Sequence, residues 1–520
     1  MQVLRKGGSA TDAAIAVMLA LGVVEPQSSG IGGGGFYVRT DSQGTVETLD
    51  GRETAPAAAG ADWFLDADGK PLDFRDVIAT GKSIGVPGNI ALAAEAHQRH
   101  GVLAWSELFQ PALALARDGW VLTERGADYA ARFADRAGLD PYGNSLFYDS
   151  SGAPRPVGTR ITNPALAATL ERLALEGPDT FYQGPHARAM ADTIAAATPG
   201  AARMTTADIA GYQAIWRDPV CGSYRIYRIC GMGPPSSGAT TVFAILKQLE
   251  GFDLGALGPQ SPVFWHIFAE SQRVAYADRA RYLADSDFVP VPVSGLIDAE
   301  YLRGRGALIA PDRRMPAVDA GRPSGAIAVG VGHEPAESGT SHFVVIDAAD
   351  NAVSYTSTIE NSFGSGHMVG GFFLNNELTD FSFVPEAEGQ PVANRVEGGK
   401  RPRSSMSPTL VFAPDGSLKI AIGAAGGATI PVQVAETLIA ILDWNMDADA
   451  AIALPLLFSP GDTMFIEGHL PLQGLVPQLE ALGHKVRTAE LPHKVNAIVA
   501  TSDGWLPAAD PRSEGAGMRD

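Results

Sequence analysis

A sharp change in composition at Gly339–Thr340 constrains the possible fold of this 520-residue chain more than any other feature does. The preceding residues, 311–339, are rich in Pro, Gly and charge and have no sustained apolar period. Residues 343–346, by contrast, form an apolar, β-branched run that predicts a buried strand. A turn over 347–351 and a second strand over 352–359 complete a predicted hairpin. A turn centred on Ala349 places Thr340 opposite Thr358, whereas a slip of one residue sends these side chains to opposite faces.

A threonine that begins a buried strand after a loose connection is compatible with one known chemistry. If the bond between Gly339 and Thr340 is cut, Thr340 becomes a new N-terminus, with its hydroxyl as the nucleophile and its α-amine as the base. A free α-amine has a pKa of roughly 7.7–8.0, so it accepts a proton near neutral pH. By pattern alone an ordinary strand threonine is the commoner explanation, because Gly-Thr often begins a strand.

A series of short motifs resembles the γ-glutamyltranspeptidase (glutathione hydrolase) family. The motifs follow the family's order and span nearly the whole chain, so the resemblance is specific for the family and less so for the substrate. They are residues 50–56 (Asp-Gly-Arg-Glu-Thr-Ala-Pro), 340–342 (Thr-Ser-His), 351–353, Thr358, 363–365, 374–376 (Leu-Asn-Asn), 380–382, 401–409 (Arg-Pro-Arg-Ser-Ser-Met-Ser-Pro-Thr) and 426–427 (Gly-Gly).

The predicted elements indicate a general fold class, and the resemblance implies a specific architecture within it. Long β runs with helices on either side, and no regular βαβ alternation, predict a layered α+β protein. The resemblance implies the four-layer αββα sandwich of N-terminal-nucleophile hydrolases. Residues 1–339 would be the large-subunit part of a precursor, ending in the linker 311–339, and residues 340–520 the small-subunit part. Both parts together would form one domain that cleaves itself between Gly339 and Thr340.

The resemblance also implies catalytic roles. Thr340 would be the nucleophile, Thr358 would position its hydroxyl, and the backbone N–H groups of Gly426 and Gly427 would hold the oxyanion. By pattern, Gly426 and Gly427 lie at a strand-to-helix turn, where free N–H groups suit an anion. A simple tight turn is an equally good explanation of these two glycines.

The resemblance also implies which residues recognise the substrate. Arg52, Ser404 and Ser405 match positions that hold the substrate carboxylate, and Glu377 and Asp380 match those that hold its α-ammonium. Taken alone, a strand-end arginine and scattered carboxylates are usually solvated charges. Glu360 departs from the family, because many members have asparagine there, and the added negative charge makes γ-glutamyl specificity less certain than the reaction type.

Three functions follow, of which the first two are enzymes of one fold and the third belongs to another class. The first is an autoprocessing γ-glutamyl amide hydrolase and acyltransferase, acting on glutathione and related γ-glutamyl compounds, with water or an amine or peptide as acceptor. The second is an amidase of the same fold for glutaryl or cephalosporin-type acyl groups. The third is an uncleaved, non-catalytic binding protein. No metal or cofactor is implied by any of them.

Composition excludes several partners. The net charge of −19 argues against nucleic acid and against an anionic membrane surface. Residues 30–35 satisfy the G-x-G-x-x-G pattern, but they follow a helix and precede a strand, which is the wrong order for a dinucleotide site. We therefore interpret these glycines as allowing a close approach of backbones. The apolar run 13–24 is too short to span a bilayer.

The chain contains two cysteines, Cys221 and Cys230, which flank a predicted hairpin. A turn at Arg225–Ile226 would place them opposite each other, so a cross-strand disulfide is possible. In the absence of other evidence, the sequence favours two free, half-buried thiols.

The first eight residues contain no apolar segment of a signal peptide. Family members usually have a further segment ahead of this point, often with an export signal, and are often periplasmic or secreted. The resemblance thus implies a chain that starts late, and the sequence assigns no compartment.

Apolar periodicity predicts the remaining elements. Residues 385–400 are polar and lack aromatics, and they resemble a shortened form of the segment that covers the active site in some members. Helices are predicted at 9–24, 89–100, 105–118, 164–176, 186–197, 204–212, 239–250, 262–284, 431–442 and 472–482, and strands at 36–39, 46–50, 410–412, 419–422, 495–500 and 505–508.

Overall fold

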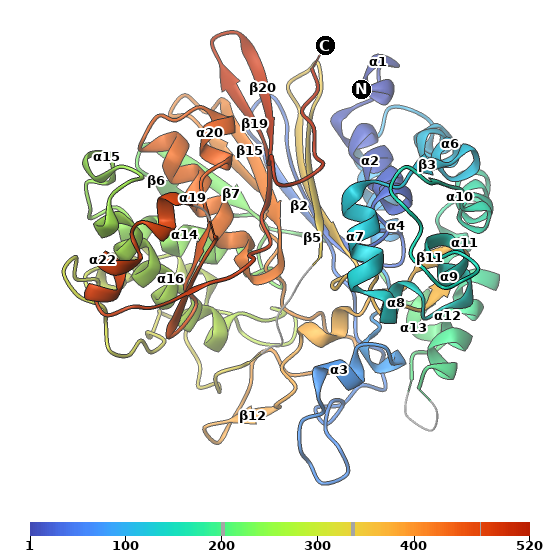
Figure 1. The fold of residues 1–520 in the computed structure, drawn as a ribbon, viewed down its shortest axis with the longest axis horizontal. Helices are drawn as coiled ribbons and strands as arrows, with labels where there is room; N and C mark the ends of the chain where they lie inside the picture. Colours follow the sequence, from blue (N-terminus) through green and yellow to red (C-terminus); the bar gives the residue numbers. More distant parts are fainter. Residues whose placement is uncertain (199–202, 334–338, 469, 520) are drawn as a thin grey trace.

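Two antiparallel sheets form the centre of the molecule (Figure 1). The computed structural model describes residues 1–198, 203–333, 339–468 and 470–519. The first sheet has the strand order β5-β2-β1-β9-β8, and the second has the order β20-β19-β15-β14-β7-β6. The strands are β1 (Gly34–Thr40), β2 (Val46–Gly51), β5 (Ile215–Arg217), β6 (Val220–Tyr224), β7 (Tyr227–Gly231), β8 (Ser341–Ile346), β9 (Ala352–Thr358), β14 (Thr409–Phe412), β15 (Leu418–Ala425), β19 (Lys494–Thr501) and β20 (Gly504–Ala509).

Helices cover the outer face of each sheet, which gives four layers in the order α, β, β, α (Figure 1). Helices α2 (Ala10–Val24) and α4 (Asn89–His100) pack on the first sheet. Helices α14 (Gly238–Leu249) and α19 (Ile430–Leu442) pack on the second, and α16 (Pro262–Tyr282) packs against α14. Further helices are α5 (Trp105–Leu108), α6 (Gln110–Asp118), α7 (Glu124–Arg132), α10 (Pro164–Glu176), α12 (Pro185–Ala196), α13 (Thr206–Ala210), α18 (Ala299–Gly306), α20 (Ala448–Ile452), α21 (Leu470–Gln473) and α22 (Val476–Ala481).

Strands from both sides of the Gly339–Thr340 bond enter both sheets. In the first sheet β1 pairs with β9, and in the second β7 pairs with β14. Residues 1–333 and 339–519 therefore complete one another's hydrogen-bond ladders. Neither part has a full sheet of its own, so cleavage of the chain would leave two polypeptides that stay together.

The hairpin that begins after Thr340 has the predicted register. Ser341 pairs with Ser357 and Ile346 with Ala352, so Thr340 lies opposite Thr358 at the open end. Asp347 closes the turn by accepting backbone N–H bonds from Ala349 and Asn351. All seven residues of β9 are buried, because the strand lies between β1 and β8 in one direction and between helices and the second sheet in the other.

Several helices match the sequence prediction and two do not. Helix α2 begins after Ser9, which forms a capping box with Asp12. The helix predicted over 105–118 is divided into α5 and α6, because Pro111 can enter a helix only in its first turn. The helix predicted over 472–482 is likewise divided into α21 and α22, and Pro477 lies in the first turn of the second.

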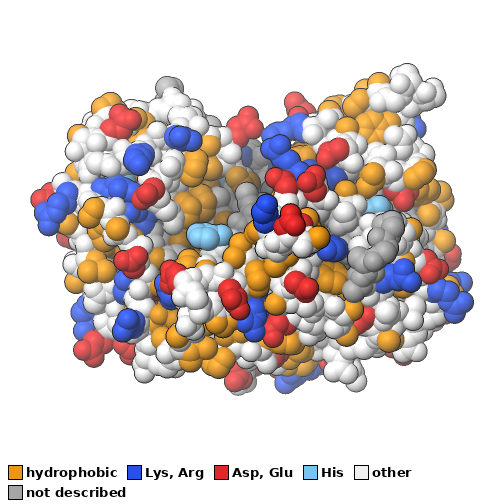
Figure 2. All heavy atoms as spheres, turned by 90° about the horizontal axis from the view of Figure 1, so that it is seen from below, with side chains coloured by type: hydrophobic (Ala, Val, Ile, Leu, Met, Phe, Trp, Pro, Cys, Tyr) orange, Lys and Arg blue, Asp and Glu red, His pale blue; other side chains and the backbone are white. Residues whose placement is uncertain are grey.

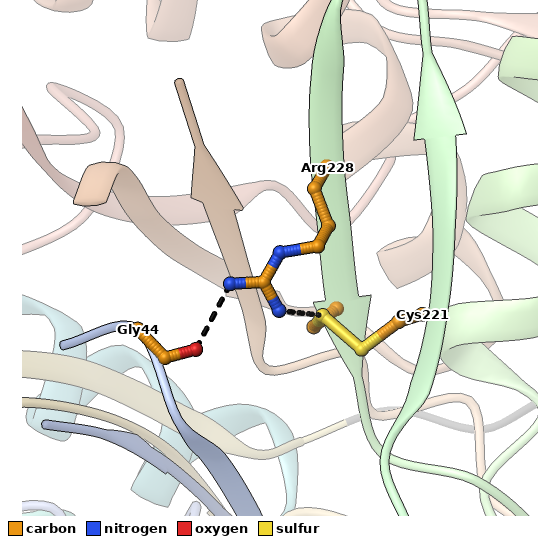
Figure 3. Close-up of a disulfide and its surroundings, with 4 residues drawn as sticks. Gly44, Cys221 and Arg228 are labelled. Atoms are coloured by element: carbon orange, nitrogen blue, oxygen red, sulfur yellow. Dashed lines mark hydrogen bonds between the residues drawn. A yellow bond between two sulfur atoms is a disulfide. The ribbon is translucent and has the colours of Figure 1, made fainter. Parts of the chain in front are cut away.

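The prediction of free thiols is wrong, because Cys221 and Cys230 form a disulfide (Figure 3). They are directly opposite each other in the β6–β7 hairpin, with the turn at Arg225–Ile226 as predicted. Arg228 contacts the sulfur of Cys230 and donates to the carbonyl oxygen of Gly44, 2.9 Å away, in the β1–β2 turn (Figure 3). The disulfide thus stabilises an edge hairpin that contacts the other sheet.

We expect replacement of both cysteines by serine to lower stability without preventing the fold. The bridge closes a loop with a sequence separation of 9 residues, and loop-closure entropy for that length is roughly 2–3 kcal/mol. The urea midpoint of the double variant, compared with the parent under oxidising and reducing conditions, measures the effect. A reductant that shifts the midpoint of the double variant as much as that of the parent would contradict this assignment.

The distribution of charge on the surface agrees with a chain that contains many residues of both signs. Acidic and basic side chains are interspersed over the face drawn in Figure 2, so neither sign of charge forms one continuous patch there. Among the helices within the described ranges, none has both the length and the apolar character needed to cross a membrane.

Candidate active site

A small pocket lies at the start of the β8–β9 hairpin, between the two sheets. It brings together side chains from the ends of β2, β9 and β15 and from the segments around 377–380 and 404–406. Its lining consists of Arg52, Thr340, Thr358, Glu360, Glu377, Asp380, Ser404, Met406, Gly427 and Ile430. Eight of these ten are residues that the sequence singled out as candidates.

Three other candidates lie just outside this lining. Gly339 and Gly426 line a larger cavity that adjoins the pocket across the Gly339–Thr340 bond. Ser405 is buried, and its hydroxyl accepts a hydrogen bond of 2.7 Å from Arg279. The arrangement therefore separates Ser404, which faces the pocket, from Ser405, which packs against α16.

Thr340 is held by contacts on both sides. Its side chain is buried, and its backbone N–H donates to the carbonyl oxygen of Ser28, 3.2 Å away. Its hydroxyl donates to the Thr358 hydroxyl oxygen at 3.2 Å, and that oxygen also accepts from the backbone N–H of Glu360 at 2.8 Å. A fixed N–H and a fixed hydroxyl on one residue are the groups that an N-terminal nucleophile uses.

The backbone is strained at Thr340, and only glycine suits the residue before it. Thr340 has φ +88°, a conformation that is an outlier for a β-branched residue, and Gly339 has φ +122°. A side chain at position 339 would meet the carbonyl oxygen of Glu360 at 2.0 Å, so only glycine fits. The strain at Thr340 typically costs about 1–3 kcal/mol, and breaking its bond to Gly339 would release it.

Gly426 and Gly427 form the predicted strand-to-helix turn between β15 and α19. Both have positive φ, 133° and 59°, which favours glycine. The side chain of Gln433 fixes the conformation of the turn, because it donates to the carbonyl oxygens of Ala425 and Pro492, each 3.0 Å away. The turn therefore keeps one shape beside Thr340, as a preorganised oxyanion site requires.

Arg52 is the centre of a buried charge cluster. Its guanidinium donates to Glu377 and to Asp380, and it also donates to the carbonyl oxygens of Pro402 (3.1 Å) and Arg403 (3.0 Å). Burial lowers the pKa of Arg52, but the two carboxylates more than compensate, and its pKa is raised above the ordinary value. The cation is therefore held in place by the two anions that lie beside it.

Two further carboxylates lie beside this cluster. Glu360 has φ +71° and accepts from the side-chain amide of Asn376. Burial raises the pKa of Glu53 to about 7, against the lowering effect of Arg52, so this carboxyl group is partly protonated near neutral pH. The pocket therefore has more anionic than cationic groups, which suits a ligand that carries an ammonium group.

Sequence reasoning missed four residues of the site: Ser28, Glu53, Met406 and Ile430. Glu53 and Met406 stand inside the motifs at 50–56 and 401–409, so the motifs themselves carried the signal. Ser28 contributes its backbone carbonyl oxygen, a group that every residue type has, so its identity in the sequence carries no signal. Ile430 reaches the pocket from the first residue of α19.

Sequence comparisons with known proteins agree with the catalytic site that this geometry indicates. A family model described as gamma-glutamyltranspeptidase matches residues 1–519. The glutathione hydrolase proenzyme of Bacillus subtilis is 36% identical over 94% of this chain and 83% of its own length. The acylase ACY 1 proenzyme of Pseudomonas sp. strain V22 is 35% identical over 98% of this chain and 88% of its own.

The fold is also found among solved structures. The cephalosporin acylase of Bacillus halodurans superimposes with a TM-score of 0.85 at 24% sequence identity, over 99% of this chain and 92% of the acylase. The predicted four-layer αββα sandwich is thereby confirmed.

Proposed function

Because this chain belongs to the gamma-glutamyltranspeptidase family, we propose that it is an autoprocessing γ-glutamyl amide hydrolase and acyltransferase with Thr340 as its nucleophile. Glutathione and related γ-glutamyl compounds are its substrates. The observation that carries the proposal is the position of Thr340, whose buried hydroxyl lies in one pocket with a cation and several carboxylates.

Processing uses the same hydroxyl as catalysis. The Thr340 oxygen attacks the carbonyl carbon of Gly339, the peptide bond becomes an ester, and water then hydrolyses the ester. The products are chains 1–339 and 340–520, with a free α-amine on Thr340. The strain at Thr340 supports this order, since cutting its bond to Gly339 relieves it.

In the mature enzyme the α-amine of Thr340 accepts the proton of its own hydroxyl, and the hydroxyl oxygen attacks the γ-amide carbon. The Ser28 carbonyl oxygen, which now accepts from the Thr340 N–H, is in place to orient that amine. Thr358 orients the hydroxyl, and the N–H groups of Gly426 and Gly427 stabilise the oxyanion. Losing one such donor typically costs about 10²–10³ in rate.

The charge cluster recognises the α-amino acid end of the donor. Its carboxylate takes a place at Arg52 with Ser404, and its ammonium binds between Glu377, Asp380 and Glu360. Ser405, whose hydroxyl accepts from Arg279, would support this place from behind. A zwitterionic ligand can replace the existing ion pairs of Arg52, because its carboxylate can pair with Arg52 while its ammonium pairs with the carboxylates of Glu377 and Asp380. A ligand with a carboxylate alone would leave the acidic groups without a partner.

Two observations favour a second function, acylase activity on a non-amino acyl group. Glu360 stands where many family members have asparagine, and two similar proteins are named acylases. Rates on γ-glutamyl-p-nitroanilide and glutaryl-p-nitroanilide separate the two functions. Faster cleavage of the glutaryl compound would overturn the γ-glutamyl assignment, and a single uncleaved band on a denaturing gel would indicate a non-catalytic protein.

We expect hydrolysis to compete well with transfer. In the segment 385–400, the strands β12 (Glu386–Ala387) and β13 (Gln390–Pro391) form a short hairpin with several exposed residues and no aromatic side chain. Water therefore reaches the acyl-enzyme easily. The ratio of glutamate to transfer product, measured over a range of acceptor concentrations, tests this, and dominant transfer at low acceptor concentration would contradict it.

A further inference from the structure

Two separate segments of the chain carry the groups that meet the α-amino acid end of the donor. One segment carries Glu377 and Asp380, and the other carries Ser404. Arg52 reaches both segments, because it donates to the side chain of Asp380 and to the carbonyl oxygen of Arg403, 3.0 Å away. A donor that has both an ammonium and a carboxylate therefore needs the two segments at one fixed separation.

Asn394 joins the same two segments through its side chain. Its amide nitrogen donates to the backbone carbonyl oxygen of Asp380, 2.7 Å away, and its amide oxygen accepts from the backbone N–H of Arg403, 2.9 Å away. The backbone carbonyl oxygen of Asn394 also accepts from the N–H of Ser382 at 2.9 Å. The residue is 1% exposed and is not part of the pocket lining, so it can affect a donor only through the segments that it joins.

The chain around Asn394 is itself held in place. The backbone N–H of Gly330 donates to the carbonyl oxygen of Pro391 at 3.0 Å, and the buried Lys400 ammonium donates to that of Ala393 at 2.7 Å. The tip of the β12–β13 hairpin, by contrast, is exposed. The segment 385–400 thus has a fixed base, which carries Asn394, and an exposed tip.

We propose that Asn394 is a positioning residue, which sets the separation between the carboxylates that bind the ammonium and the Ser404 region that binds the carboxylate. It thereby makes the site selective for acyl donors that carry both charges. The inference rests on the proposed function and names what selects the α-amino acid end of its substrates.

The selectivity follows from geometry. A donor with a single charged group can shift to meet one segment alone, whereas a donor with two charged groups cannot shift toward one segment without leaving the other. Misplacement by about 1 Å can cost roughly 100-fold in rate. Self-cleavage needs neither charged group, because the acyl group that Thr340 attacks is then Gly339, so it should continue without Asn394.

The chain offers a matched control in Asn163, a buried asparagine with the same kinds of bonds outside the pocket lining. Its amide nitrogen donates to the carbonyl oxygen of Gly371 at 2.8 Å, and its amide oxygen accepts from the N–H of Leu166 at 2.9 Å. Asn163→Ala therefore removes comparable bonds elsewhere. Gln390→Ala is a second control, because it removes an exposed amide from the tip of the hairpin.

The test measures kcat and KM of the processed proteins on three p-nitroanilides. The γ-glutamyl compound carries both charges, the 4-aminobutyryl compound carries the ammonium alone, and the glutaryl compound carries the carboxylate alone. We expect Asn394→Ala to raise the KM for the γ-glutamyl compound by about 10- to 100-fold with little change in kcat, because two buried hydrogen bonds that position the donor site are lost. The other two donors should change little.

Asn394→Asp has nearly the same shape, so it keeps the test open if Asn394→Ala does not fold. It keeps the oxygen that accepts from Arg403 but turns an oxygen toward the Asp380 carbonyl oxygen, so the same rise in KM is expected. Both control variants should affect the three donors equally. Equal losses on the three donors with either Asn394 variant, or a loss confined to kcat, would overturn the proposal.

Binding measured without turnover separates this inference from the proposed function. Ligand-observed NMR with L-glutamate, 4-aminobutyrate and glutarate makes the same comparison in the same processed proteins. Glutamate binding that depends on Asn394, in a protein that cleaves no γ-glutamyl donor, would reject the proposed function and retain the role of Asn394. Cleavage of the γ-glutamyl donor with no selective dependence on Asn394 in either assay would do the reverse.

Discussion

Thr340→Ala yields one uncleaved chain of 520 residues that turns over no γ-glutamyl donor. The hydroxyl is needed twice, first to attack the Gly339 carbonyl and then to attack the substrate. Removing a covalent nucleophile typically lowers kcat by about 10⁶-fold. A denaturing gel shows the difference, because the parent separates into chains 1–339 and 340–520.

Two measurements make this prediction specific to Thr340. N-terminal sequencing of the smaller parent chain should begin Thr-Ser-His-Phe, and any other start would place the nucleophile elsewhere. Thr340→Ser keeps a hydroxyl and is expected to cleave, which separates loss of chemistry from loss of folding. Thr358→Ala removes the hydroxyl that accepts from Thr340 at 3.2 Å and should slow both steps without abolishing them.

Arg52→Lys should damage donor binding even though it keeps the positive charge. The guanidinium of Arg52 donates at once to Glu377, Asp380 and two carbonyl oxygens, and a lysine ammonium cannot reproduce this planar arrangement. Truncating one partner of a buried charge pair typically costs about 2–5 kcal/mol, which is roughly 30- to 4,000-fold in affinity. We expect the lower end of that range, because the charge remains, and we expect self-cleavage to continue.

The matched donor is 4-aminobutyryl-p-nitroanilide, which keeps the ammonium group and lacks the α-carboxylate. The loss of kcat/KM in Arg52→Lys should be large for γ-glutamyl-p-nitroanilide and small for this donor. Arg217→Lys is the control variant, since Arg217 is largely buried against Asp50 and does not line the pocket. Equal losses on the two donors would show that Arg52 supports structure alone.

Much of the local structure could be predicted because it depends on neighbouring residues. Ser9 and Asp12 define the start of α2 through a capping box, and the short turn after Ile346 sets which residue faces Thr340. Where prediction failed locally, the reason was also local: Pro111 begins a new helix inside an apolar pattern that looks continuous. Most of the pocket residues could be predicted as well, because they belong to the short motifs that the chain shares with its family.

The sequence by itself determined the hairpin and the residue at its open end, because these follow from side-chain alternation and the position of the turn over some twenty residues. The structure was needed to choose the register with Thr340 opposite Thr358 over a slip of one residue. Only the tertiary structure decided which distant groups meet there. Arg52 lies at the end of β2 and Glu377 more than three hundred residues later, and the fold brings the segment 377–380 against the end of β2, where the two residues form an ion pair. The disulfide required the two sulfur atoms to be within bonding distance, and the cavity beside Gly339 required α7 to lie against Arg512 and Lys494. Contacts of this kind depend on the relative positions of whole layers, and no stretch of sequence records those positions.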